Sequence, residues 1–344
     1  LLLDATCAPQ DIRHPHDVTL LSEAREKLEE MIDAICEAAG EVEKPRTYRR
    51  TARAQYLTFM HGRRRTRQEI RRATRKQLGF VRRDLGHVAK LIRKYGAQAL
   101  TSRQLRDYEV IKKIYEQQRY LYDNKTHSIP HKIISIAQDH VRPIARGKMA
   151  RPFEFGAKIS VSVTDGRMVF IDRLSWEPYN ECHDLELQVE RFKKRFGHYP
   201  ESVHADKIYR TRENRAWCAA RGIRLSGMPP GRPLAATPEN RALIRKLRRQ
   251  LRRDDAVRQE VESVFGVGKR RYGMGLIKEK TRETSEASIN VCVLLMNLEK
   301  ILRDLFLRLS GWLYPRFLSI PAGMRFEDAV HGTRASMRGI LMCA

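Results

Sequence analysis

The chain of 344 residues is long enough for one large domain or two, and its hydrophobic fraction of 42% suits a globular fold with a sizeable core. Lys and Arg number 67 against 41 Asp and Glu, which gives a formal net charge of +26. A surface of this charge repels cations and attracts polyanions, so nucleic acid is the first partner to consider. A protein bound to a membrane surface is the competing interpretation.

No stretch of the sequence is typical of a membrane span or a secretion signal. The longest apolar run, INVCVLLMNL at 289–298, is too short for a helix to cross a bilayer. The six cysteines are scattered without a CxxC pair, so neither a structural zinc site nor a disulfide framework is indicated. We therefore predict a cytoplasmic protein without a membrane segment.

The stretch LLLDAT opens the chain and predicts a buried strand, because its apolar residues run on without interruption. It lacks an initiator Met, so we expect a partial chain from which an N-terminal helical domain is missing. A turn-rich linker follows, and apolar residues at helical spacing then predict a helix over 18–39.

A very basic block lies between residues 46 and 83. It holds fourteen Lys or Arg against a single acid, Glu69, and aromatic side chains are interleaved with the cations. Helical periodicity then continues over 82–122. We predict that residues 17–150 form a large, mostly helical basic insertion after the first strand. Such a charge run is either a solvated face or a surface that binds DNA, and the total excess of charge favours DNA.

The pattern changes at residue 153. FEFGAKISVSVTDGRMVFIDRLSW alternates apolar and polar residues on both sides of Asp165-Gly166, which predicts a hairpin with a tight turn. The elements expected after it are a helix over 183–196, the strand SVHAD, a helix over 212–221, the strand GIRLSG, a loop over 229–238 and charged helix over 239–265.

This order predicts an α/β fold with one mixed sheet flanked by helices. We divide the chain into the first strand of the core at 1–16, the insertion at 17–150, the remainder of the core at 151–275 and a C-terminal helical region at 276–344. The last region contains an apolar helix over about 288–309, which is interpreted either as core or as a dimer surface.

Two aspartates close short apolar strands, Asp4 after LLL and Asp206 after SVHA. If these strands are neighbours, the two carboxylates meet at one edge of the sheet and can bind a hard divalent cation such as Mg²⁺ through oxygen. The alternative is that each is a turn former or a helix cap, which is the commoner role of a single Asp at a strand end.

A third acid lies in the segment AVRQEVESVFGVGKRRY at 256–272. Arg258 and Glu262 are four residues apart and share one face of the predicted helix, and Lys269 follows just beyond it. This arrangement suits a carboxylate on a metal ion with cations gripping neighbouring phosphates. The alternative is an ordinary solvated ion pair. Glu260 is the second choice for the acid, since it lies about 200° from Glu262 around the helix.

Six stretches occur in the order expected of bacterial insertion-sequence transposases: LLLDAT, EFGAKISVSV, SWEPYNE, HADKIYRTRENR, GIRLSGMPPGRP and RQEVESVFGVGKRRYG. The sequence resembles the DDE class, in the broad group related to insertion sequence five. The resemblance covers the opening strand and nearly all of residues 151–275. It implies an RNase H-like catalytic core in which three acids hold two Mg²⁺ or Mn²⁺ ions.

Matched residue by residue, the resemblance places the three acids, which are both catalytic and metal-binding, at Asp4, Asp206 and Glu262. Arg258, Glu262 and Lys269 match the last three members of a tyrosine, arginine, glutamate, lysine pattern. The sequence departs from the family at Asp255, where the tyrosine is expected, and at Ile208, where many relatives have Gly.

The resemblance implies DNA cleavage at the ends of a mobile element, followed by strand transfer into target DNA, by a nucleoid-associated homodimer that binds terminal inverted repeats. The alternatives are an inactive or truncated remnant that only binds DNA, and an RNase H-like nuclease without strand transfer. The cations expected to contact DNA are Arg258, Lys269, Arg270, Arg271, Lys207, Arg210 and Arg212, with the run of Arg and Lys at 245–253 in support.

Overall fold

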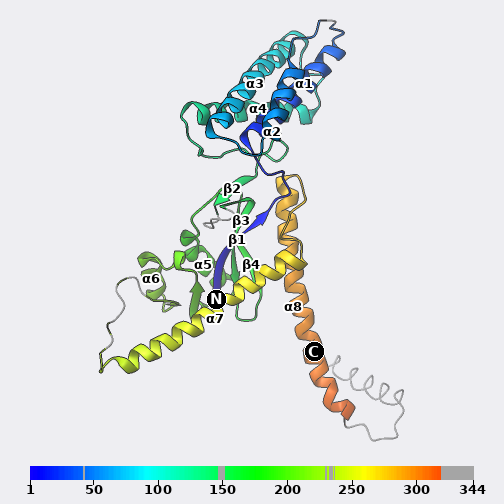
Figure 1. Ribbon diagram of the computed structural model, residues 1–344. Helices are drawn as coiled ribbons and strands as arrows, with labels where there is room; N and C mark the ends of the chain where they lie inside the picture. The colour runs from blue at the N-terminus through cyan, green and yellow to red at the C-terminus, as the bar shows by residue number, and fades with distance from the viewer. Residues whose placement is uncertain (42, 146–151, 229–230, 232–234, 236, 319–344) are drawn as a thin grey trace. The chain divides into compact units, whose positions relative to one another are not determined.

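The computed structural model describes the chain apart from residues 42, 146–151, 229–230, 232–234, 236 and 319–344, and for residues 311–318 it describes the backbone alone. The chain divides into two compact units, residues 1–293 and residues 294–344. The first unit contains a six-stranded sheet with its helices and a separate bundle of four helices (Figure 1).

The sheet is mixed, as the sequence predicts, with the strand order β2-β3-β1-β5-β6. Strand β1 is antiparallel to β3 on one side and parallel to β5 on the other, and β6 continues the parallel part. Strands β2 and β4 share the remaining edge of β3. The strands are β1 (Leu2–Pro9), β2 (Arg142–Ala145), β3 (Phe153–Val163), β4 (Val169–Ser175), β5 (Ser202–Ala205) and β6 (Arg224–Leu225).

The predicted hairpin at Asp165-Gly166 is confirmed as the connection between β3 and β4. Its turn is closed by the amide of Thr164, which donates to the carbonyl of Met168 at 3.0 Å, and Arg167 adopts a left-handed backbone with φ of 59°. Successive side chains of a strand point to opposite faces of the sheet, and residues 159–163 of β3 are all buried, so both faces of the sheet are covered at this strand. The hairpin therefore fixes which face of the sheet each residue of β3 occupies.

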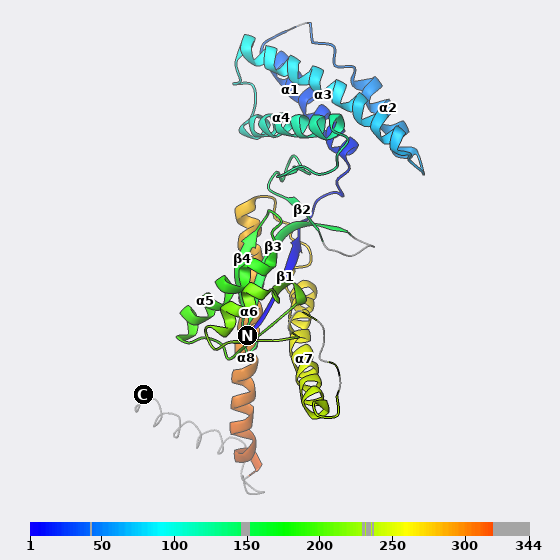
Figure 2. The same cartoon turned by 90° about the vertical axis from the view of Figure 1, so that its left-hand side faces the viewer.

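Two helices, α5 (Leu185–Phe196) and α6 (Arg212–Ala219), cover one face of the parallel part of the sheet. Their core includes Leu3 of β1 together with Val203 and Ala205 of β5, all fully buried. Two short 3₁₀ turns, η1 (Glu181–Asp184) and η2 (Lys207–Tyr209), precede these helices. The long helix α7 (Arg241–Arg271) contacts both β1 and β5 (Figure 2).

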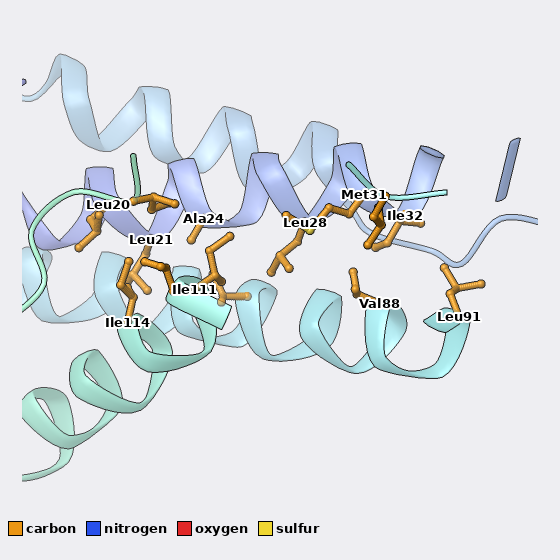
Figure 3. Packing of buried hydrophobic residues seen from close by; sticks show 14 of the residues in the cluster. Leu20, Leu21, Ala24, Leu28, Met31, Ile32, Val88, Leu91, Ile111 and Ile114 are labelled. Atoms are coloured by element: carbon orange, nitrogen blue, oxygen red, sulfur yellow. The ribbon is translucent and has the colours of Figure 1, made fainter. Parts of the chain in front are cut away.

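The basic segment predicted from the sequence to be an insertion is predominantly helical, and its four helices are α1 (Asp17–Ala38), α2 (Arg49–His61), α3 (Arg67–Tyr95) and α4 (Ser102–Asp123). Leu21, Leu28 and Ile32 of α1 pack against Val88 of α3 and Ile111 of α4 in its core (Figure 3). The helical periodicity predicted over 82–122 belongs to two helices, α3 and α4, with a short break between them. The chain leaves α3 at a glycine with φ of +82°, and α4 begins at a new capping box formed by Thr101 and Gln104.

The last helix, α8 (Arg282–Leu318), begins in the first unit and continues into the second. In the second unit its large apolar side chains are exposed over the described residues, for example Leu294 at 62% and Phe306 at 68%. The prediction that this stretch is core is therefore wrong for residues 294–309. In the part of the chain that the structure describes, none of the helices has the length and apolar character that crossing a bilayer requires.

Candidate active site

The register of β1 and β5 brings two of the predicted acids together. Leu3 of β1 pairs with Ala205 of β5 across the parallel strands. Asp4 and Asp206 are the residues that follow this pair, so they are neighbours across the two strands. Hydrogen-bonded strands lie about 4.8 Å apart, which places the two residues side by side at the end of β5. Asp206 is exposed and begins η2, to which its side chain makes no capping hydrogen bond.

Helix α7 is fixed to this part of the sheet by a buried carboxylate. Asp254, 4% exposed, accepts hydrogen bonds from both terminal nitrogens of Arg224 on β6, at 2.8 and 3.0 Å. The same carboxylate lies 3.7 Å from the ring of His204 on β5. A bidentate Arg–carboxylate pair restricts orientation as well as distance. Asp254 therefore sets the position of the next turns of α7 over β1 and β5.

Asp4 lies in an environment that disfavours its charge. Burial raises the pKa of its carboxyl to about 6, and the carboxylates of Glu181 and Asp206 act in the same direction. The amide of Ala5, which donates to Asp4 Oδ1 at 2.8 Å, and the guanidinium of Arg258 act against this rise in pKa. Within the described residues Asp4 makes no ion pair, so its carboxylate remains available to a cation.

Glu262 lies on α7 one turn beyond Arg258 and pairs with it at 3.5 Å, which is the solvated ion pair that the sequence left open as the alternative. The Glu262 side chain is 64% exposed and is not among the groups that act most strongly on Asp4. Glu260 instead pairs with Arg167 of the β3–β4 turn at 3.4 Å. The structure thus places Glu262 on the helix that contacts β1 and β5, with its side chain exposed to solvent.

The sequence prediction that α7 ends near Phe265 is wrong, because the helix continues to Arg271. Lys269 is therefore on the helix, seven residues after Glu262 and on the same face. Arg270 is exposed, and the guanidinium of Arg271 lies 5.8 Å from the ring of Tyr272.

Of the cations after Asp206, Lys207 and Arg212 are exposed, as contact with DNA requires. Arg210 instead has a structural contact. Its guanidinium donates two hydrogen bonds to the carbonyl of Ala205, at 2.9 and 3.1 Å, and so closes the end of β5. Ile208 is 42% exposed in η2, and the side chain of Asp255 is also exposed, so neither departure from the family pattern disturbs the core.

Sequence reasoning missed Glu181 and Tyr209. Glu181, at the start of η1, pairs with Lys158 of β3 at 2.9 Å, and both side chains are less than one-fifth exposed. Tyr209 of η2 is fully buried, and its hydroxyl has no hydrogen-bond partner in the described part of the chain. Burial raises the pKa of the Tyr209 phenol, with Glu181 and Asp4 as the charged groups that raise it further. Neither residue belongs to a periodic pattern that the sequence could have shown.

The donor set suits a hard divalent cation, but the site is incomplete in this conformation. The carboxylates of Asp4 and Asp206 are the ligand type that Mg²⁺ and Mn²⁺ prefer. Among the described residues, however, no group of three or more His, Cys, Asp or Glu side chains is arranged to hold a metal ion. The two aspartates therefore provide carboxylate ligands of the right type, and the described residues bring no third acid to them.

Besides the cations that follow Asp206 and those on α7, a cationic surface lies on α2 and α3. The side chains of Arg72, Arg75 and Lys76 are exposed and make no ion pair within the described residues. Other arginines stack on aromatic rings, for example Arg65 at 4.9 Å from the centre of Phe59. Such a surface combines charge for phosphates with planar groups and is typical of nucleic-acid binding.

Comparison with protein families found one match, to the model described as "Transposase DDE domain", over residues 203–299. The matched residues hold Asp206, Arg258, Glu262 and Lys269, while Asp4 lies outside them. Comparison with curated proteins found no match, and comparison with solved structures found none either. The match, together with the paired aspartates, supports a DDE transposase, a class of enzyme whose substrate is DNA.

Proposed function

We propose that the chain is the catalytic core of an insertion-sequence transposase of the group related to insertion sequence five, which cuts the ends of its element and joins them to target DNA. The observation that carries this proposal is the juxtaposition of Asp4 and Asp206 across a parallel strand pair. The match over residues 203–299 supports the same class of enzyme.

The proposal includes an RNase H-like arrangement of the sheet. Its support is the topology, in which three antiparallel strands β1, β3 and β4 are followed by β5 and β6 added in parallel on the other side of β1. The acids then follow a regular pattern: one on β1, one directly after β5 and one on the helix that contacts both strands.

In the proposed mechanism Asp4, Asp206 and Glu262 supply the carboxylate oxygens that hold Mg²⁺ or Mn²⁺. Held by these carboxylates, divalent ions would supply activation of a water or 3′-hydroxyl and charge stabilisation of the leaving oxygen of a phosphodiester. Glu262 reaches the aspartates only by leaving its exposed position beside Arg258. That exchange frees the guanidinium of Arg258 to contact a phosphate of the bound DNA.

The remaining cations are proposed to hold the DNA backbone. Lys207 and Arg212 lie on the side of Asp206, and Lys269, Arg270 and Arg271 extend the line of α7 beyond Glu262. The exposed cations of α2 and α3 form a further backbone surface on the insertion. Contacts of this kind give affinity that falls steeply with salt and carries little sequence information.

The active form is proposed to be a homodimer that uses α8. Leu294, Leu298, Ile301 and Leu305 follow one another at alternating spacings of three and four residues, and all are at least 44% exposed. This spacing is the seam of a two-stranded coiled coil, in which an identical helix covers the apolar face.

The test is cleavage of labelled DNA that carries an element end by the purified chain in Mg²⁺. We expect nicking that requires the metal and is lost in Asp206→Asn and in Glu262→Gln, while Glu260→Gln retains it. Transfer of the cut strand into a second DNA distinguishes a transposase from a nuclease. Unchanged cleavage in both Asp206→Asn and Glu262→Gln would eliminate the proposed site.

A further inference from the structure

Glu181 is fixed beside the turn that follows Asp206. The buried side chain of Asn214 donates one hydrogen bond to the carbonyl of Cys182 in η1 and another to the carbonyl of Tyr209 in η2, each at 2.8 Å. These two bonds tie the two short turns together. Glu181, which is adjacent to Cys182, is therefore held close to the end of β5 although it comes from a distant part of the chain.

The charge around Asp4 is unbalanced toward the negative. Its three strongest charged neighbours are two carboxylates, Glu181 and Asp206, and one guanidinium, Arg258. Glu181 is neutralised by Lys158, and this pair is 18% and 15% exposed. Charges taken so far out of water require compensation by opposite charge. A divalent cation bound at Asp4 and Asp206 would supply that compensation.

Tyr209 supplies the second, independent observation. Its side chain is 0% exposed, and its hydroxyl has no acceptor in the described part of the chain. Buried hydroxyls without a partner are uncommon in native proteins and call for an explanation. The charged groups that act most strongly on this phenol are Glu181 and Asp4, so the unsatisfied donor lies within the electrostatic influence of the same carboxylates.

We propose that Glu181 is a further metal-binding carboxylate of the site at Asp4 and Asp206, and that the Tyr209 hydroxyl donates to a water held by the bound cation. In the metal-free protein the ammonium of Lys158 pairs with the carboxylate of Glu181. The incoming cation displaces this ammonium. This inference rests on the proposed function, since it assigns new ligands to the same site. It adds a carboxylate that already acts electrostatically on Asp4, in contrast to Glu262, whose side chain is solvent-exposed.

The test is calorimetric titration of Mn²⁺ into the purified chain without DNA. We expect Glu181→Gln to weaken Mn²⁺ binding by about tenfold or more. Lys158→Met removes the competing ammonium and is expected to strengthen binding. Glu186→Gln, at an exposed position of α5 five residues along the chain, is the matched control and should bind Mn²⁺ like the parent.

Thermal unfolding of Tyr209→Phe provides a second readout that does not depend on removing a charge. Without Mn²⁺ the variant should melt at the parent's temperature, because the deleted hydroxyl has no partner to lose within the described residues. With saturating Mn²⁺ its rise in melting temperature should be smaller than that of the parent. An equal rise would count against the role of the hydroxyl.

The outcomes separate this inference from the function on which it rests. If Asp4→Asn loses Mn²⁺ binding while Glu181→Gln binds like the parent, the inference is overturned and the proposed site stands. If Asp4→Asn binds Mn²⁺ as tightly as the parent, the site itself is wrong and both proposals fall together. Circular dichroism of each variant confirms that the sheet and helices are formed before the comparison is made.

Discussion

Asp4 and Asp206 directly follow Leu3 and Ala205, two buried residues that pair across the parallel strands β1 and β5. More than 200 positions separate the two aspartates in the sequence, and this pairing places them side by side where β5 ends. This arrangement makes ionisation of Asp4 unfavourable, because its carboxyl is partly buried and two other carboxylates, Glu181 and Asp206, act on it.

The first prediction concerns the stability of the metal-free protein. Since the pKa of Asp4 is about 6 in the folded state and 3.8 in its ordinary state, the folded protein holds more protons than the unfolded chain between these values. The free energy of unfolding therefore falls as the pH rises through this window. Asp4→Asn removes the effect, so the variant should be more stable than the parent above pH 6, by up to about 3 kcal/mol.

Urea denaturation at several pH values measures this difference. Below pH 4 the two proteins should be equally stable, because Asp4 is then neutral in both states of the parent. Asp255→Asn, at an exposed position of α7, is the control and should follow the parent throughout. If the free energies of unfolding of the parent and of Asp4→Asn differ by the same amount at all pH values, the pKa of Asp4 is not raised in the folded protein.

The second prediction tests the contact between β1 and β3. A Cβ atom at Gly156 would lie 2.1 Å from the carbonyl oxygen of Ala8 and 2.9 Å from the Cα of Pro9, both of them backbone atoms that cannot turn away. Gly156→Ala should therefore destabilise the protein by about 1–3 kcal/mol or more. Thermal unfolding measures the loss, and an unchanged melting temperature would mean that the strands are not this close.

Gly79→Ala is the matched control for that substitution. Gly79 lies inside α3, and nothing stands within 4 Å of the Cβ that Ala would add. Because Ala has the higher helix propensity, this variant should gain about 0.5–1 kcal/mol. The two glycines should thus respond in opposite directions to the same chemical change.

Most of the sheet could be predicted from the sequence, because alternation and strand-end residues carry the information. The hairpin at Asp165-Gly166 follows from period-two alternation around a turn dipeptide. The prediction that Asp4 ends its strand is wrong, because β1 continues to Pro9 and Asp4 lies within it. Asp4 and Asp206 still meet, because β1 and β5 are neighbours. Glu181 could not be found in this way, since its place near Asp4 depends on hydrogen bonds made by Asn214 in a different helix.

Helix ends were predicted less well, and each error has a physical cause. Gly266 and Gly268 favour an end to α7, yet the helix continues and Gly268 is buried within it. The glycine with a left-handed backbone is Gly273, with φ of +82°, two residues after the helix. The sequence alone does not show which of three glycines takes that conformation.

The third prediction concerns the cations of the insertion. Replacing Arg72, Arg75 and Lys76 of α3 with Gln removes three exposed charges that make no ion pair in the described part of the chain. Binding to duplex DNA should weaken, and the slope of log K against log salt should fall in magnitude by about 3 if all three contact phosphates. Fluorescence anisotropy over a range of salt concentrations measures the slope.

The control for this experiment removes the same number of charges from α4. The control variant replaces Lys112, Lys113 and Arg119 with Gln. Of these, Lys112 and Arg119 already pair with acids of the same helix. An equal loss of affinity in both triple variants would show that net charge alone governs binding, and that the surface on α2 and α3 has no special role.

The fourth prediction concerns the proposed dimer. Leu298→Glu with Ile301→Glu places two carboxylates in the apolar seam of α8 and should convert a dimer to a monomer in sedimentation velocity. Arg303→Glu changes the net charge by the same two units on the same exposed stretch of helix, and it should leave the dimer intact. A parent chain that is monomeric at micromolar concentration would contradict the seam.

The most direct test of the central claim is a crystal structure of the chain with Mn²⁺ and a DNA end, in which anomalous scattering locates the metal. We predict an anomalous peak between the carboxylates of Asp4 and Asp206, with Glu262 turned in from its exposed position on α7. Manganese bound elsewhere, with these aspartates free of metal, would contradict the claim that Asp4 and Asp206 form the catalytic centre.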